Sequence, residues 1–276
     1  MIKEFIGYLR TLALQTWNNR EITWELARRD LKRQYKGAAL GIIWAAAQPM
    51  LFVFVFWFAV EIGLRGDRGT TGGFPFILWL IPAMFAWRVI ASTLSMASNS
   101  VQRHRELVTK VVFPSITIPQ FSVLSLFLIH VGLMVFAIVI FIATGNMPTI
   151  YWLQIPYVVA ANFVFCVVLA ILLSALTTYS RDLFQMIKVS TTGLFWFTPI
   201  IWPITNVVSA SETLGFILRL NPIAYLIEAY RWAMIYGNWF WEHPLWSLYF
   251  WGFVLVLFCL AVFIWGRLSR YFADVL

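Results

Sequence analysis

The chain has 276 residues, of which 61% are hydrophobic, 18% are aromatic and 12% are charged, and its formal net charge is +8. Soluble domains average about 25% charged residues, so this composition is too poor in charge to cover the surface of a soluble domain of this size. It excludes an ordinary soluble enzyme and indicates that the lipid bilayer is the solvent of the chain.

Long uncharged stretches predict six membrane-spanning helices. A helix needs roughly 20 apolar residues to cross ~30 Å of hydrocarbon, and residues 37–60 contain no Asp, Glu, Lys or Arg. Residues 111–180 also lack these residue types and leave room for two spans, separated by the turn-forming sequence TGNMPT at 144–149. With the other apolar runs, the expected spans are about residues 40–60, 76–98, 118–143, 155–177, 187–203 and 245–266. We therefore expect an all-α integral membrane protein.

The distribution of Lys and Arg among the loops predicts the orientation of these spans. If both termini lie in the cytoplasm, 15 of the 20 basic residues lie on the cytoplasmic side, which is the asymmetry typical of membrane proteins. The other five lie outside or in the outer half of a span: Arg65, Arg68, Arg88, Arg219 and Arg231. Topology and attraction to anionic lipid explain the positive charge, so we expect no nucleic-acid partner.

The first 36 residues form a cationic segment before the first span. Trp24, Ala27, Leu31 and Tyr35 recur at helical spacing and share one face of a predicted helix over residues 20–36. Five bases flank or oppose this face: Arg28, Arg29, Lys32, Arg33 and Lys36. The pattern is typical of a helix that lies in the membrane interface among lipid headgroups. A solvated, positively charged tail is the alternative.

Two shorter cytoplasmic segments join later spans. RHRELVTK, within residues 99–119, predicts a short polar helix that Pro114 and Pro119 end or kink on its C-terminal side. Spacing alone fits a plain connector or a contact for a cytoplasmic partner, and the connector is the simpler interpretation. The second segment contains Arg181 and Asp182 at the cytoplasmic end of the fourth span, where they can anchor a helix end.

Residues 204–243 form the longest external segment, and it is not hydrophilic. Asn221 is a predicted N-cap with Pro222 in the first helical turn, and Gly237 ends the apolar stretch. This stretch is too short to span the membrane, so we expect a pair of re-entrant or interfacial helices on the outer face. Glu228 and Arg231 stand at i,i+3 spacing and can form an ion pair, for which a structural role is the simpler interpretation.

The sequence lacks the motifs that would place catalysis on this chain. It contains no G-x-x-x-x-G-K-[ST], so we expect no ATP to bind through a P-loop of its own, and it contains neither H-E-x-x-H nor G-x-S-x-G. No Cys/His cluster predicts a metal site. Five aromatic residues lie within the second and fifth spans: Trp79, Phe85, Trp87, Trp196 and Phe197. Packing against lipid is their default role, and contact with a sugar-bearing or amphipathic cargo is the alternative.

An ordered set of motifs resembles a known transporter family. The set is RRDLKRQYKGAALGIIWAAAQP, RELVTKVVFP after the second span, YSRDL after the fourth, FWFTPIIWP in the fifth, LNPIAYLIEAYR outside and RYFADVL at the end. Over about residues 20–276 it resembles the permease subunit of type-2 ABC exporters for polysaccharides, the group that exports O-antigen, capsule and teichoic acid. The stretches EIGLRG and TKVVFPSITIPQF are most similar to the wall teichoic acid exporter permease.

This resemblance implies a domain organisation and partners that composition does not show. Residues 1–36 would be a cytoplasmic segment with an interfacial helix, and residues 37–276 a six-helix ABC-2 type transmembrane domain. The chain would form a homodimer in the cytoplasmic membrane and dock two copies of a separate ATPase subunit. That subunit would bind ATP and Mg²⁺, whereas this chain would bind no cofactor. The cargo would be a glycan polymer linked through diphosphate to a polyprenol lipid.

The resemblance also assigns roles to residues. A coupling helix over about residues 101–112 would rest in the ATPase, and the external helices of residues 204–243 would line the outer exit with Asn221, Glu228 and Arg231. The residues that couple to the ATPase or lie near the cytoplasmic gate would be Arg103, His104, Arg105, Glu106, Lys110, Arg181 and Asp182. The aromatic residues named above would line the cargo path. Arg88 would contact cargo phosphate or extend toward the membrane interface.

Two other functions fit the same composition. An ABC-2 permease for drugs or small lipids would share the whole architecture and differ only in its cargo. An integral membrane glycosyltransferase or acyltransferase would instead need acids or histidines gathered at one membrane face. The three histidines and twelve acids of this chain are scattered along the sequence.

Overall fold

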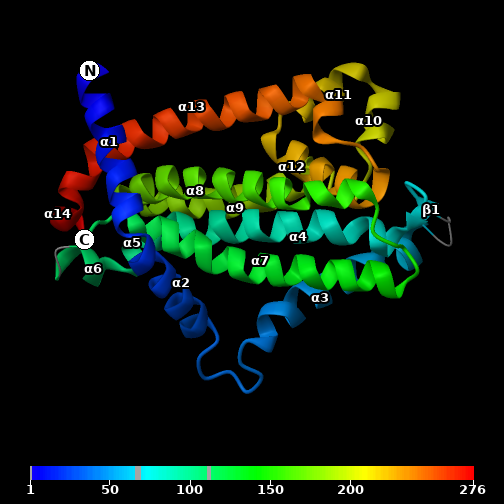
Figure 1. Cartoon of the computed structure of the whole chain (residues 1–276), viewed down its shortest axis with the longest axis horizontal. Helices are drawn as coiled ribbons and strands as arrows, with labels where there is room; N and C mark the ends of the chain where they lie inside the picture. Colours follow the sequence, from blue (N-terminus) through cyan, green and yellow to red (C-terminus); the bar gives the residue numbers. More distant parts are fainter. Residues whose placement is uncertain (1, 66–69, 111–112) are drawn as a thin grey trace.

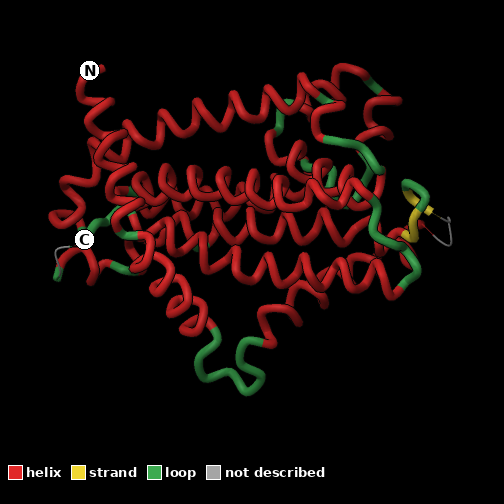
Figure 2. Tube along the Cα trace, in the orientation of Figure 1, coloured by secondary structure: helices red, strands yellow, loops and turns green. Residues whose placement is uncertain are grey.

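The computed structural model describes residues 2–65, 70–110 and 113–276, and helices dominate it (Figure 2). In residues 2–109 the elements are α1 (Ile2–Asn18), α2 (Arg20–Gln34), α3 (Ile43–Trp57), η1 (Phe58–Arg65), β1 (Thr70–Thr71), β2 (Phe74–Pro75), α4 (Phe76–Ser95), η2 (Ala97–Asn99), α5 (Ser100–Arg103) and α6 (Arg105–Thr109). The remaining elements are α7 (Thr117–Ala143), η3 (Ile150–Gln154), α8 (Ile155–Tyr179), α9 (Arg181–Phe197), α10 (Ile204–Ala210), α11 (Glu212–Arg219), α12 (Pro222–Arg231), η4 (Trp232–Tyr236), η5 (Phe240–Glu242), α13 (Pro244–Leu268), η6 (Ser269–Tyr271) and α14 (Phe272–Val275).

The all-α membrane fold expected from composition is confirmed. Among the described residues, five helical stretches are long and apolar enough to cross a membrane: Ile43–Gly63, Phe76–Thr109, Thr117–Ala143, Ile150–Tyr179 and Pro244–Val275. They correspond to the predicted first, second, third, fourth and sixth spans. The small antiparallel pair of β1 and β2, with Thr71 opposite Phe74, is a turn before α4 that the sequence analysis did not predict.

The predicted fifth span, at residues 187–203, differs from the structure. Helix α9 covers Arg181–Phe197, so it begins and ends six residues earlier than expected. It begins at Ser180 because the side-chain oxygen of this residue accepts a hydrogen bond from the Leu183 backbone N–H at 3.2 Å. It ends because Thr198, which precedes Pro199, is extended. Its 17 residues measure ~25 Å, less than the ~30 Å of a bilayer core.

Helix α4 is the centre of the bundle. Sixteen of its 20 residues are buried, and it contacts α3, α7, α8, α9 and α12. Figure 1 shows α4, α7, α8 and α9 side by side, with α13 crossing on one side. Apart from Arg88 and a few hydroxyl residues, α4 is apolar on every side, and a helix of this composition can be buried in protein or face lipid.

The two ends of the bundle differ in their elements. Both chain termini lie at one end, together with α5 and α6, and α10, α11 and α12 lie at the opposite end (Figure 1). Helix α1 packs on α13, which the sequence analysis did not predict. The C-terminal end of α2 and the N-terminal end of α3 project from the bundle and meet in a loop over residues 35–42, so that the two helices form a V (Figure 1).

Candidate functional site

Helix α2 packs on α7 through a narrow face that includes an acid. Ala27 and Asp30 are the buried residues of α2, with exposures of 0% and 6%, and the two helices lie in contact. Trp24, in contrast, is 44% exposed. The expected apolar face is therefore only partly confirmed, because the packed face is turned from Trp24 toward Asp30. The five bases predicted for the interface are all exposed: Arg28, Arg29, Lys32, Arg33 and Lys36.

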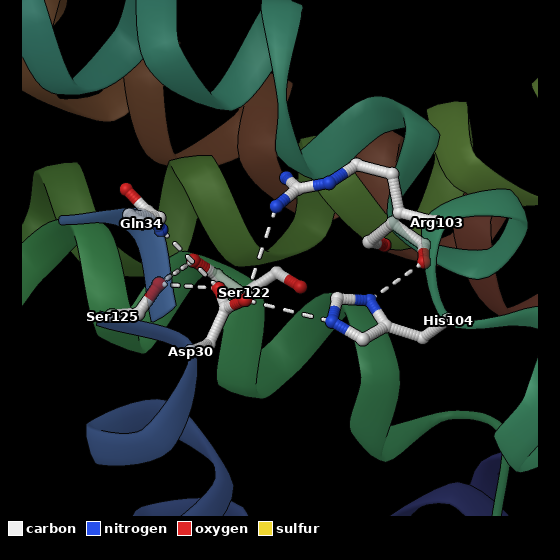
Figure 3. Close-up of polar contacts among 7 residues, drawn as sticks. Asp30, Gln34, Arg103, His104, Ser122 and Ser125 are labelled. Atoms are coloured by element: carbon white, nitrogen blue, oxygen red, sulfur yellow. Dashed lines mark hydrogen bonds and ion pairs between the residues drawn. The ribbon is translucent and has the colours of Figure 1, made fainter. Parts of the chain in front are cut away.

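Asp30 joins three elements through a polar network (Figure 3). Its Oδ1 lies 3.8 Å from the guanidinium of Arg103 and 3.5 Å from Nε2 of His104. Its Oδ2 accepts hydrogen bonds from the Ser125 hydroxyl at 3.1 Å and from the Gln34 amide at 3.3 Å. The carboxylate thus connects α2 to α7 and to the segment where α5 ends and α6 begins.

The network keeps Asp30 ionised. Burial alone would raise the pKa of this carboxyl, but the hydrogen bond and charge of His104, the charge of Arg103 and the Ser125 hydroxyl together hold the pKa below its usual value. Nδ1 of His104 lies 3.0 Å from the Ser100 carbonyl, an acceptor, so Nδ1 is assigned the proton. Nε2 then faces Asp30 and completes an ion pair when His104 is doubly protonated. The site therefore holds an anionic Asp30 against Nε2 of His104.

The predicted coupling helix is broken in the structure. Residues 101–110 form the end of α5 and all of α6, with the break at His104, and residues 111–112 of the predicted helix lie outside the described residues. Arg105, Glu106 and Lys110 are exposed, and Lys110 lies 3.7 Å from Glu106. The sequence analysis predicted the polar character of this segment but missed its break, which falls at His104, a contact of Asp30.

A cavity of about 370 Å³ opens beside this network. Its lining includes Asp30, Glu106 and four arginines: Arg29, Arg33, Arg103 and Arg105. Helix α2 and the α5–α6 segment both contribute to it, so the cationic segment and the predicted coupling segment form one surface. This surface is electropositive and suits an acidic or phosphate-bearing partner.

Arg181 and Asp182 open α9 and are both exposed. They lie at the junction of α8 and α9, where Ser180 caps the helix, and none of the lining residues of the basic cavity comes from this junction. The structure therefore confirms a helix end at this point. The role of the pair near a gate stays a prediction.

The external ion pair predicted from spacing is confirmed. Arg231 Nη1 donates to Glu228 Oε1 at 2.8 Å, and the two side chains are 0% and 5% exposed. The guanidinium also donates to the backbone carbonyls of Pro199 and Ile200 at 2.6 and 2.5 Å and lies 3.4 Å from the ring centroid of Trp79. The predicted N-cap is confirmed too, because the Asn221 side chain accepts from the Ile223 N–H at 3.0 Å. Arg231 thus ties α12 to α4 and to the segment after α9.

The five aromatic residues predicted for the cargo path fall into two groups. Trp79, Phe85 and Trp87 are buried in the core around α4, at 0%, 1% and 6% exposure. Trp196 and Phe197, at the end of α9, are 56% and 72% exposed. In this structure only Trp196 and Phe197 are widely exposed, whereas Phe85 and Trp87 line cavities beside α4. Contact of the first group with cargo stays a prediction.

Arg88, predicted to lie in the outer half of a span, is nearer the end of α4 that was predicted to be cytoplasmic. Arg88 lies in the second half of α4, toward the end that leads into α5. It shares a cavity with Gln34 and Tyr35 of the N-terminal segment, because α2 and α3 fold back along α7 and α4. Of the other arginines placed outside, Arg68 lies outside the described residues.

Asp30 is the site residue that the sequence analysis missed. Its signal was weak: it stands three residues after Ala27, on the face that packs against α7, within a segment dominated by bases. In the sequence, an acid among bases is indistinguishable from a polar surface residue. Its burial becomes visible only when the helix against which it packs is known. Its partners Arg103 and His104 had been identified only through the family resemblance.

Comparison with known proteins matches the chain to one transporter family and to permeases of one export system. The profile of a family described as ABC-2 type transporter matches residues 21–235. An O-antigen export system permease protein RfbA of Klebsiella pneumoniae is 27% identical over 252 residues, which cover 91% of this chain and 93% of that protein. An RfbA permease of Myxococcus xanthus is 26% identical over 227 residues, which cover 82% of this chain and 85% of that protein. The region matched by the family runs from α2 to η4, so it includes Asp30, the broken coupling segment and the Glu228–Arg231 pair.

Proposed function

Because the chain belongs to the ABC-2 type transporter family, we propose that it is the membrane subunit of an exporter for a cell-surface polysaccharide of the O-antigen type. The observation that carries this proposal is the alignment of 91% of the chain with an O-antigen export permease. The chain is a multi-pass membrane protein of a transport family, and the proposal adds that it lies in the cytoplasmic membrane with both termini inside. The cargo would be linked through diphosphate to a polyprenol lipid.

The energy would come from a separate ATPase subunit. We expect ATP and Mg²⁺ to bind to that subunit and no cofactor to bind to this chain. The docking surface would be the exposed Arg105, Glu106 and Lys110 with the adjoining basic cavity, at the end that holds both termini (Figure 1). Asp30 would act as a positioning residue, because it joins α2 to the α5–α6 segment so that ATPase movements reach both elements.

The working unit would be a homodimer with two ATPase copies. Helix α9 exposes Met186, Val189 and Trp196, at 64%, 76% and 56%. The spacings of these residues place them on one face of the helix. Such a face suits a second copy of the chain, and a dimer seam there would place Trp196 and Phe197 where sugars pass.

The family assignment and the relatives favour the polysaccharide exporter over the alternative functions. A membrane glycosyltransferase or acyltransferase is set aside, since the family consists of transport subunits. A permease for drugs or small lipids shares the family, but the relatives compared here export O-antigen. Teichoic acid and capsule stay predictions of the sequence resemblance, with no support from these relatives.

Depletion of the chain from its native cells tests the proposal. We expect the surface polysaccharide to disappear while the lipid-linked polymer accumulates on the cytoplasmic side, where it is protected from an externally added glycosidase. Restoring the wild-type chain should return the polymer to the surface. Unchanged surface polymer after depletion would contradict the proposed cargo class.

A further inference from the structure

Two adjoining cavities meet at Arg88. The first, of about 350 Å³, is lined on its polar side by Gln34, Tyr35, Gln48 and Ser92. The second, of about 440 Å³, is mainly apolar and is lined by residues of α3 and α4 that include Phe52 and Val55. Gln48, Phe85 and Arg88 line both cavities. The first cavity, which carries these polar groups beside apolar ones, and the mainly apolar second cavity therefore share a wall that carries a cation.

Arg88 has no anionic partner in this wall. It is the only Asp, Glu, Lys or Arg among the described residues that line the two cavities. Its Nη2 donates to the Gln48 side-chain oxygen at a long 3.4 Å, and its buried Nε has no hydrogen-bond partner among the described residues. Ionisable side chains within a membrane helix are costly, and they usually pair or mark the path of a substrate. The unused donors of Arg88 thus point to an anionic ligand.

The position of Arg88 restricts what that ligand can be. Arg88 lies seven residues before Ser95, the last residue of α4, which is ~10 Å along the helix axis. A phosphate held at this depth keeps contact with the interface through the polar cavity, and an attached apolar chain fits the neighbouring cavity. Arginine is suited to this task because its planar fork binds phosphate oxygens in pairs.

We propose that the two cavities together bind the diphosphate end of the cargo's lipid anchor, with Arg88 contacting a phosphate and the cavity beside Phe52 holding the first part of the apolar chain. This inference rests on the proposed function, because it takes the lipid-linked cargo as given. It adds a recognition site formed by a single chain, between the V of α2 and α3 and the central helix α4.

Ligand binding to the purified exporter complex in detergent tests the site. The probe is a short-chain polyprenyl diphosphate, and the readout is tryptophan fluorescence, since Trp87 lines the apolar cavity. We expect Arg88→Gln to weaken binding by about tenfold or more, the usual range for a lost charge-assisted hydrogen bond. Arg88→Lys should retain part of the affinity, because it keeps the charge and loses the fork. Binding by Arg88→Gln at wild-type affinity would overturn the proposal.

A matched control and a stability measurement exclude a merely structural role. Arg10→Gln removes an exposed arginine of α1 that lines neither cavity and should leave binding unchanged. Without ligand, Arg88→Gln should melt at the wild-type temperature or above it, because it removes an unpaired charge. Loss of folding in Arg88→Gln together with normal binding by Arg88→Ala in the intact complex would overturn the proposal.

Competition identifies the source of the phosphate. Inorganic pyrophosphate and phosphatidylglycerol should each displace the probe only at much higher concentration than unlabelled polyprenyl diphosphate. Equal displacement by pyrophosphate would overturn the lipid part of the proposal, and equal displacement by phosphatidylglycerol would overturn its assignment to the cargo anchor. The binding assay does not depend on export, so it can succeed even if the proposed function is wrong. If depletion of the chain leaves the surface polysaccharide intact but binding still requires Arg88, the proposed function is contradicted and the binding site is supported.

Discussion

Replacing Arg231 by Met should strongly destabilise the end of the protein that contains α12. Arg231 is fully buried, and its guanidinium bonds to Glu228 at 2.8 Å and to two backbone carbonyls, those of Pro199 and Ile200. Removing one partner of a buried ion pair leaves an uncompensated charge and costs ~3–5 kcal/mol. Each carbonyl that loses its donor adds ~1–3 kcal/mol unless it finds another. We therefore expect a loss of at least ~4 kcal/mol in the free energy of unfolding.

The double variant Glu228→Gln/Arg231→Met separates the ion pair from the other contacts. It removes the lone buried carboxylate, so it should recover ~2 kcal/mol relative to Arg231→Met alone. The control is Arg219→Met, which changes an exposed arginine of the neighbouring α11 and should stay within ~0.5 kcal/mol of wild type. Unfolding in mixed micelles, followed by tryptophan fluorescence, measures all three. A loss below ~1 kcal/mol for Arg231→Met, or a double variant no more stable than the single one, would refute this account of the pair.

Three further predictions concern the cytoplasmic end and the topology. Asp30→Asn should destabilise the protein by ~2 kcal/mol at neutral pH. Because the Asp30 pKa is lowered in the fold, the carboxylate contributes to stability above ~pH 4, and this contribution is lost as the pH falls through the folded-state pKa. The free energy of unfolding should therefore depend less on pH in the acid range in the variant than in the wild type. Reversing the charge of Arg105 and Lys110 should leave the chain folded but uncouple ATP hydrolysis from export, measured as ATPase activity against polymer transport; unchanged coupling contradicts the docking surface. Reporter fusions should place residue 145 outside and residue 183 inside, and the opposite result refutes the orientation.

The sequence was sufficient for features that depend on local spacing. Hydropathy located five membrane-spanning stretches, because a run of ~20 apolar residues has few alternatives. Asn221 followed by proline predicted a helix start, and the i,i+3 spacing of Glu228 and Arg231 predicted their contact. Each of these signals lies within a single helix or at its start, so they need no knowledge of the tertiary fold.

Features that depend on packing between distant segments were not predictable in this way. Trp79 is buried beneath Arg231, and an aromatic residue in a mostly apolar helix gives no sign of which face is enclosed. Asp30 is buried because Ser125 of α7 and His104 meet it there, and no local pattern brings these residues together. The end of α9 was misplaced because hydropathy continues past Phe197, where Thr198 and Pro199 break the helix.

The central claim is that this chain is the membrane half of an ATP-driven exporter. Purification of the tagged chain from its native membrane in mild detergent, with mass spectrometry of the partners and the mass of the intact complex, tests it most directly. We expect two copies of this chain with two copies of a P-loop ATPase, and loss of that ATPase when Arg105 and Lys110 are reversed in charge. A folded, transport-competent chain that purifies without any ATPase would contradict it.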